Sequence, residues 1–177
     1  MRQSSLSHTD LDQAVDIWMH ELQRYSFSQL IAKPSPNSWS VGQIYIHLIE
    51  ATHYFIKQIH SCASHNENSD GDAYPAAKSM FNNNDFPDEL LDGPPSNAVT
   101  PQPESKDQIT AGLIKMKEDL KKAAELAHQN QSAGKTKHFG LGYFTAAEWL
   151  QFAEMHMRHH LRQKKRLDEF LKLNNIH

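Results

Sequence analysis

Four segments of this chain repeat apolar side chains at intervals of three and four residues, and this pattern constrains the fold more than any other feature. In an α-helix such spacing places the apolar residues on one buried face. The pattern predicts helices over residues 7–31, 40–62, 105–131 and 145–173, and no segment has the alternation typical of a strand. The sequence therefore predicts an all-α protein, a single domain over residues 1–177 built as a four-helix bundle.

Helix-start signals support three of these predictions. The stretches SVGQ at residues 40–43, SKDQ at 105–108 and TAAE at 145–148 each fit a capping box, in which the first and last side chains bond free backbone N–H groups. Pro34 and Pro36 cannot continue a helix, so the first helix is expected to end before them.

Residues 63–104 differ from the rest of the chain. They are rich in Asn, Asp, Ser, Gly and Pro and carry no strong period, apart from a short turn expected at PDELL, residues 87–91. A connection of this length inside a compact domain is often functional, so we expect a crossover or lid between the second and third helices. The apolar residues expected to pack back onto the bundle are Phe81, Phe86, Leu90, Leu91 and Val99.

The fourth predicted helix contains EMHMRHHLRQ, residues 154–163, within a chain that has 12 histidines. Because helical residues advance by about 100° each, His156 and His160 fall in the middle of the apolar face. His159 falls at the edge of that face, and Arg158 and Arg162 fall mostly on the other side. The first two histidines are thus predicted to point into the bundle.

Two imidazoles four residues apart on a helix can bind one metal ion. The helical metalloprotease motif also needs a Glu directly after the first His, and Met157 in that place excludes it. His47, on the flank of the second helix's apolar face, is the candidate third ligand. Three imidazoles suit Zn²⁺ or Ni²⁺ and leave a coordination position open. The alternative is a helical bundle whose buried histidines bind no metal.

Several other side chains are candidate neighbours of such a site, although each is more often structural. They are Trp39, Tyr45, Glu50, His53, His138, Tyr143 and His159.

Composition narrows the class of protein further. The formal net charge of −3 gives no basic character, so no nucleic-acid partner is expected. Cys62 is the only cysteine, which excludes an internal disulfide and fits a reducing, cytoplasmic location. The first residues lack the apolar core of a signal peptide, and no apolar run approaches the roughly 18 residues that would span a membrane.

Two stretches resemble a known family. SWSVGQIYIHLIEA is similar to the start of the second helix, and FTAAEWLQFAEMHMRHHLRQKKRL to the last helix, of the DinB/YfiT-like superfamily. The resemblance implies a four-helix bundle in up-down-down-up order, often a homodimer. It also implies one divalent metal ion, usually Zn²⁺ or Ni²⁺, held by His47, His156 and His160. Relatives with known activity include transferases and isomerases that use low-molecular-weight thiols.

Three functions agree with these features. The first is a metal-dependent thiol S-transferase, in which the metal lowers the pKa of a small thiol. The second is metal-assisted hydrolysis, which needs a carboxylate base, and Glu50 is predicted to point away from the apolar face. The third is a non-catalytic metal-binding or stress-related protein. No residue of this sequence identifies the thiol, the small-molecule substrate or a catalytic group.

Overall fold

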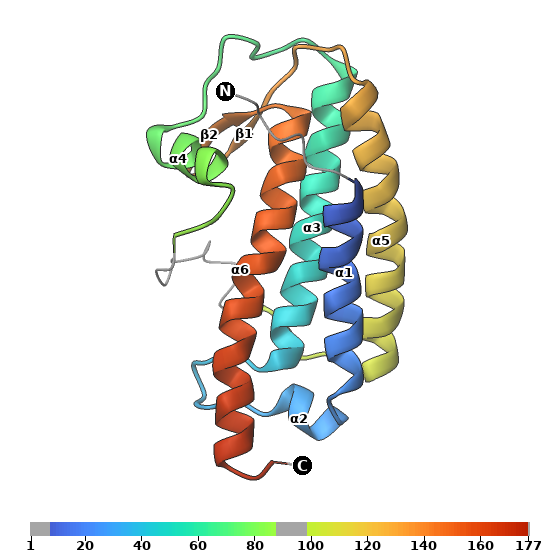
Figure 1. Ribbon diagram of the computed structural model, residues 1–177, viewed down its shortest axis with the longest axis vertical. Helices are drawn as coiled ribbons and strands as arrows, with labels where there is room; N and C mark the ends of the chain where they lie inside the picture. The colour runs from blue at the N-terminus through green and yellow to red at the C-terminus, as the bar shows by residue number, and fades with distance from the viewer. Residues whose placement is uncertain (1–7, 88–98, 177) are drawn as a thin grey trace.

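The computed structural model describes residues 8–87 and 99–176, and four long helices dominate it (Figure 1). They are α1 (His8–Gln23), α3 (Val41–Ser64), α5 (Lys106–Gln129) and α6 (Ala146–Leu173). In Figure 1, α1 and α6 run downward whereas α3 and α5 run upward. Both α1 and α3 pack against α5 and α6. The prediction of a mostly helical protein is confirmed.

The predicted apolar faces meet along the axis between the helices. Trp18 of α1 and Tyr45 of α3 are fully buried, with ring centroids 5.0 Å apart in an edge-to-face contact. The Tyr45 hydroxyl donates a hydrogen bond of 3.0 Å to the carbonyl of Trp18, so its polar atom is satisfied inside the core. On α6, Trp149 and Ala153 are equally inaccessible. This continuous core fixes the rotation of each helix about its axis, and hence where the histidines point.

Two of the predicted capping boxes are complete, those of Ser40 with Gln43 and of Thr145 with Glu148. The third is half formed. The Ser105 hydroxyl accepts from the backbone N–H of Gln108, but the Gln108 side chain accepts from residue 104. The caps set the first residue of α3 and α6, the two helices that carry the candidate ligands.

The single helix predicted over residues 7–31 is wrong. Helix α1 ends at Gln23, and a separate short helix, α2 (Phe27–Ile31), follows. Ser26 starts α2 with a full capping box to Gln29. A capped serine needs extended backbone, which a continuous helix cannot supply. Residue 7 lies outside the described residues.

The prediction that residues 63–104 lack helical structure is also wrong. They contain α4 (Pro75–Asn83), which begins at a proline and ends where Asn84 adopts a left-handed conformation with φ 50°. Of the residues expected to pack back, Phe86 is buried and Phe81 packs against the core, but Val99 is 79% exposed. Leu90, Leu91 and most of the turn at PDELL lie outside the described residues.

The expectation of no strands is corrected by a short antiparallel hairpin of β1 (Thr136–His138) and β2 (Gly142–Phe144). Gly142 has φ 92°, and a Cβ there would lie 2.5 Å from the carbonyl oxygen of Asp72. Only glycine fits this close approach. The hairpin thereby joins the end of α5 to the start of α6 and contacts the segment before α4 through the Ala73–Gly142 bridge.

Candidate metal centre

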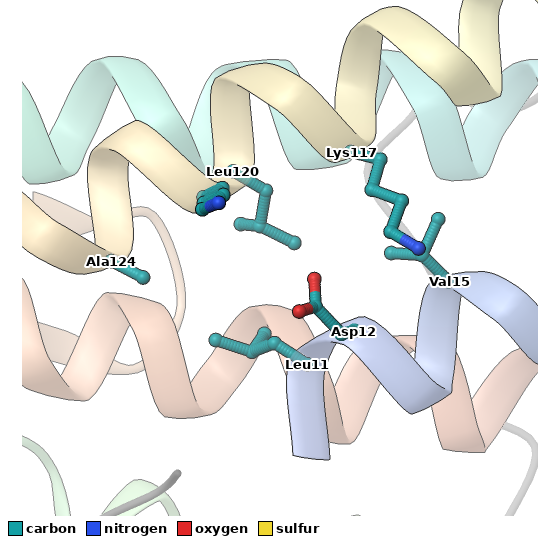
Figure 2. Close-up of a pocket in the computed structure, with 7 residues that line it drawn as sticks. Leu11, Asp12, Val15, Lys117, Leu120 and Ala124 are labelled. Carbon is teal, nitrogen blue, oxygen red and sulfur yellow. The ribbon is translucent and has the colours of Figure 1, made fainter. Parts of the chain in front are cut away.

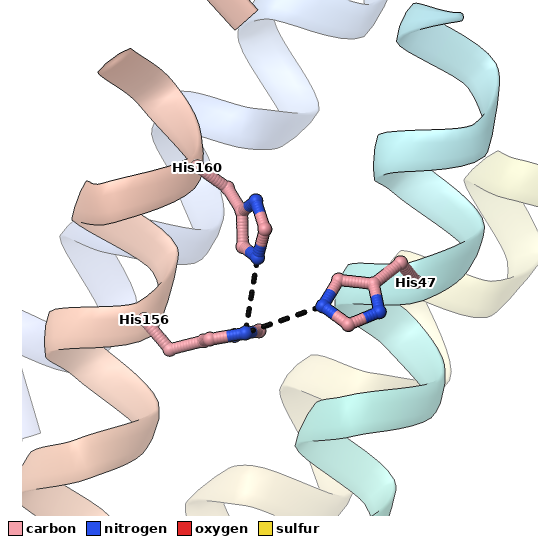
Figure 3. A group of neighbouring side chains, drawn as sticks. All are labelled: His47, His156 and His160. Atoms are coloured by element: carbon pink, nitrogen blue, oxygen red, sulfur yellow. Dashed lines mark hydrogen bonds between the residues drawn. The ribbon is translucent and has the colours of Figure 1, made fainter. Parts of the chain in front are cut away.

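Helices α3 and α6 bring together the three histidines singled out from the sequence (Figure 3). His47 comes from α3, and His156 and His160 come from successive turns of α6. The Nε2 atom of His156 lies 3.3 Å from Nε2 of His47 and 3.0 Å from Nε2 of His160. The candidate ligand atoms of all three lie within 4.8 Å of one another. His160 is buried, and the other two are partly exposed.

The two shorter separations, from His156 to His47 and to His160, match those between ligands of one metal ion. Zinc–nitrogen bonds of about 2.0–2.1 Å in a tetrahedral site place two nitrogens about 3.3 Å apart, and an octahedral arrangement places them about 3.0 Å apart. The two short distances therefore span both geometries. The donor set consists of three imidazoles, which suit borderline metals such as zinc and nickel.

Burial keeps these imidazoles neutral. It lowers the pKa of His47 to about 4, that of His160 to about 3, and that of His156 well below the usual value. Proximity adds to this effect, since each charged imidazole would repel its neighbours. Neutral imidazole is the form that binds a metal, so the site is prepared for a cation near neutral pH.

Gln163 sets the orientation of His160. Its side-chain oxygen lies 2.8 Å from Nδ1 of His160 and can only accept, so Nδ1 carries the hydrogen and Nε2 carries a lone pair. Nε2 of His156 must then donate its hydrogen to Nε2 of His160. It has no lone pair left to accept a hydrogen from Nε2 of His47, so three neutral rings cannot form both hydrogen bonds. Nδ1 of His156 is buried without a hydrogen-bond partner in the described part of the chain. A cation among the three Nε2 atoms would replace these two contacts, and the hydrogen of His156 would then lie on Nδ1.

Aromatic rings surround the cluster. Phe55 meets the His156 ring edge-to-face at 5.3 Å, and Phe152 stacks on it at 6.4 Å. Trp39, just before α3, lies 4.9 Å from the His47 ring and 6.5 Å from the His160 ring, between centroids. The rings restrict the imidazoles and lower the local polarity, which strengthens interactions with a bound ion.

The remaining histidines take other places. His159 lies beside His160, with centroids 5.2 Å apart, but is not part of the converging group. His53 faces Asp119 of α5 at 3.5 Å. His138 is buried 5.2 Å from the Phe152 ring, and its Nδ1 accepts a hydrogen bond from the backbone of Gly140. Burial lowers the pKa of His138 to about 4.

The structure places the other candidate neighbours in different surroundings. Tyr45 is committed to the core and Glu50 is exposed. Tyr143 packs its ring against Gly71. Trp39 is the one that contacts two of the three histidines. Sequence reasoning assigned no role to Gln163, although its position three residues after His160 places it on the same helix face. It also missed the approach of the Phe86 ring to His156, 6.2 Å between centroids, because no local signal relates that residue to α6.

A small pocket lies elsewhere in the molecule, between α1 and α5 (Figure 2). It has room for roughly one water molecule. Its lining comes from Leu11, Asp12 and Val15 of α1 and from Lys117, Leu120, Lys121 and Ala124 of α5. In the described residues, the group of converging metal-binding side chains lies between α3 and α6 and not at this pocket. In the part of the chain that the structure describes, no helix combines the length and apolar character needed to cross a bilayer.

Comparison with known proteins identifies the family. The model of the DinB superfamily matches residues 10–163, which include all three clustered histidines and most of the four long helices. A search of curated proteins finds no match.

Proposed function

The chain belongs to the DinB superfamily, and from this premise we propose that it binds one divalent metal ion through the Nε2 atoms of His47, His156 and His160. The observation that carries the proposal is the convergence of three neutral imidazoles, in which His156 lies at ligand-to-ligand distances from the other two. Zn²⁺ and Ni²⁺ are the metals that this donor set favours. Three protein ligands leave a position for an exogenous ligand, as in catalytic rather than structural sites.

We further propose that the protein is a metal-dependent thiol S-transferase. A bound divalent cation supplies a positive charge that lowers the pKa of a small thiol at the open position, because the thiolate is the nucleophile. The chain's own contribution is to hold three neutral imidazoles, to fix the His160 tautomer through Gln163, and to border the site with Trp39. The partner would be a low-molecular-weight thiol together with a small electrophile.

Metal-assisted hydrolysis is the alternative enzyme function. It needs a carboxylate base near the ion. Glu50, one turn after His47, is exposed, and the group that converges with His47 in the described residues contains only histidines. These observations favour the thiol reaction.

A screen of metal-loaded protein with several small thiols and electrophiles tests the reaction. The proposal expects transfer that requires both the metal and one type of thiol, and that is lost in His156→Ala. Ester or amide cleavage without any thiol would support the hydrolase instead. Absence of both reactions in fully loaded protein would support a metal-binding or stress-related role without catalysis.

Two features of the proposal rest on the family resemblance. The four long helices are proposed to be the up-down-down-up bundle of this superfamily, in agreement with their directions in Figure 1. A homodimer is proposed as the assembly, and light scattering at micromolar concentration would distinguish it from a monomer. A cytoplasmic location is proposed from the single cysteine, Cys62.

A further inference from the structure

Polar side chains of α6 bind part of the connection between α3 and α5. This part, residues 75–86, comprises α4 and the three residues after it, and we call it the arm. Arg162 donates from Nη1 to both carboxylate oxygens of Asp85 at 3.1 Å, and Arg158 donates to the carbonyl of Asn84 at 2.5 Å. Gln151 donates to the Asn84 side chain at 3.0 Å. The arm is thus attached to the outer side of α6 by charge-assisted bonds.

The attachment places one arm side chain against the candidate metal centre. Phe86 is 5% exposed, and its backbone carbonyl accepts from Nη2 of Arg162 at 3.1 Å. Its ring centroid lies 6.2 Å from that of His156 and 5.4 Å from that of His159. Phe86 therefore borders the cluster from the α6 side, whereas Trp39 borders it at His47 and His160.

Phe86 also fills the core, since its ring lies 4.9 Å from the Phe152 ring. The effect of removing the ring can be separated from the effect of releasing the arm. The arginine bonds to Asp85 and to the Phe86 carbonyl do not use the Phe86 ring, so they should hold the arm in place when the ring is truncated. Truncation would then open space beside His156 instead of releasing the arm.

We propose that Phe86 is a specificity-determining residue that limits the size of the ligand reaching the metal. The inference rests on the proposed metal site and deepens it. The Trp39 ring borders the cluster at His47 and His160, and the Phe86 ring borders it at His156. A ligand that reaches the ion on the His156 side would meet the Phe86 ring, so a compact nitrogen or sulfur donor should bind more tightly than one with a bulky ring next to the donor.

The test uses untagged protein loaded with Co²⁺, whose visible spectrum reports the coordination sphere. Metal content is measured first, and then imidazole and 4-phenylimidazole are titrated separately. Wild type should bind imidazole at least about tenfold more tightly than 4-phenylimidazole, and Phe86→Ala should reduce that ratio about tenfold, as expected when a pocket gains room for an added group. Phe81→Ala is the matched control. Phe81 belongs to the arm but contacts the Phe144 ring, so the ratio should not change.

The outcomes separate the two proposals. If wild type binds no Co²⁺, the proposed metal site fails and the inference fails with it. If all variants bind one Co²⁺ and Phe86→Ala keeps the wild-type ratio, the inference is wrong and the metal site stands. If Phe86→Ala does not fold, Phe86→Leu replaces it. A folded Phe86→Leu protein with an unchanged ratio would overturn the inference equally.

Discussion

Removal of the hydrogen-bond acceptor on Gln163 should weaken metal binding although all three proposed ligand residues remain in the chain. The Gln163 oxygen lies 2.8 Å from Nδ1 of His160 and holds the tautomer whose Nε2 lone pair faces the cluster. In Gln163→Leu the ring is free to rotate, and its Nδ1–H loses its partner. Loss of such an outer partner typically costs 10–100-fold in metal affinity, which is about 1.4–2.7 kcal/mol.

Competition against a chromophoric chelator measures the affinity of each variant for Zn²⁺. Gln163→Glu is the matched control, because a carboxylate also accepts from Nδ1 and should bind within a few fold of wild type or more tightly. Circular dichroism should show that both variants fold. The reasoning is refuted if Gln163→Leu binds Zn²⁺ within about twofold of wild type, because His160 would then be oriented without Gln163.

Two further predictions concern residues that are not proposed ligands. His138 has a folded pKa of about 4 against the ordinary value of 6.5, so the unfolded chain binds the extra proton and stability falls as the pH drops below about 6.5. His138 should therefore lower the free energy of unfolding by about 2 kcal/mol between pH 7 and pH 5. Urea unfolding at both pH values should show that His138→Gln loses less stability than wild type by that amount. Equal losses in both proteins would contradict the assignment. The Trp39 ring lies 4.9 Å from the His47 ring, so metal addition should change the tryptophan fluorescence. Trp39→Phe should lose most of this change, although it still contains the buried Trp18 and Trp149. A change of full size in Trp39→Phe would place the reporter elsewhere.

The long helices could be predicted from the sequence because their apolar periodicity and their caps are local signals. SVGQ and TAAE begin α3 and α6 where the patterns indicate, and the angular position of His156 and His160 follows from the start of α6. The stretch SFSQ at residues 26–29 carries the same signal, so the break before α2 was also available from the sequence. The unbroken apolar spacing through residue 25 concealed it.

Other features depend on contacts between distant segments. Each strand of the hairpin has only three residues, and its position rests on partners such as Cys62, whose Sγ lies 3.4 Å from the Thr136 hydroxyl. Helix α4 has only nine residues, and Pro75 and Asn84 are the only strong indications of where it begins and ends. The approach of Phe86 to His156 depends on arginines more than 70 residues away in the chain, and no local pattern records such a pairing.

The central claim is that His47, His156 and His160 form one metal site. Its most direct test is the metal content of untagged protein after equilibrium dialysis against Zn²⁺ or Ni²⁺, measured for wild type, His156→Ala and His60→Ala. His60 is exposed on α3, the helix that also carries His47, and serves as the control for loss of a histidine. The account predicts one ion per chain in wild type and His60→Ala and none held tightly in His156→Ala. Stoichiometric binding in His156→Ala, or none in wild type, would contradict it.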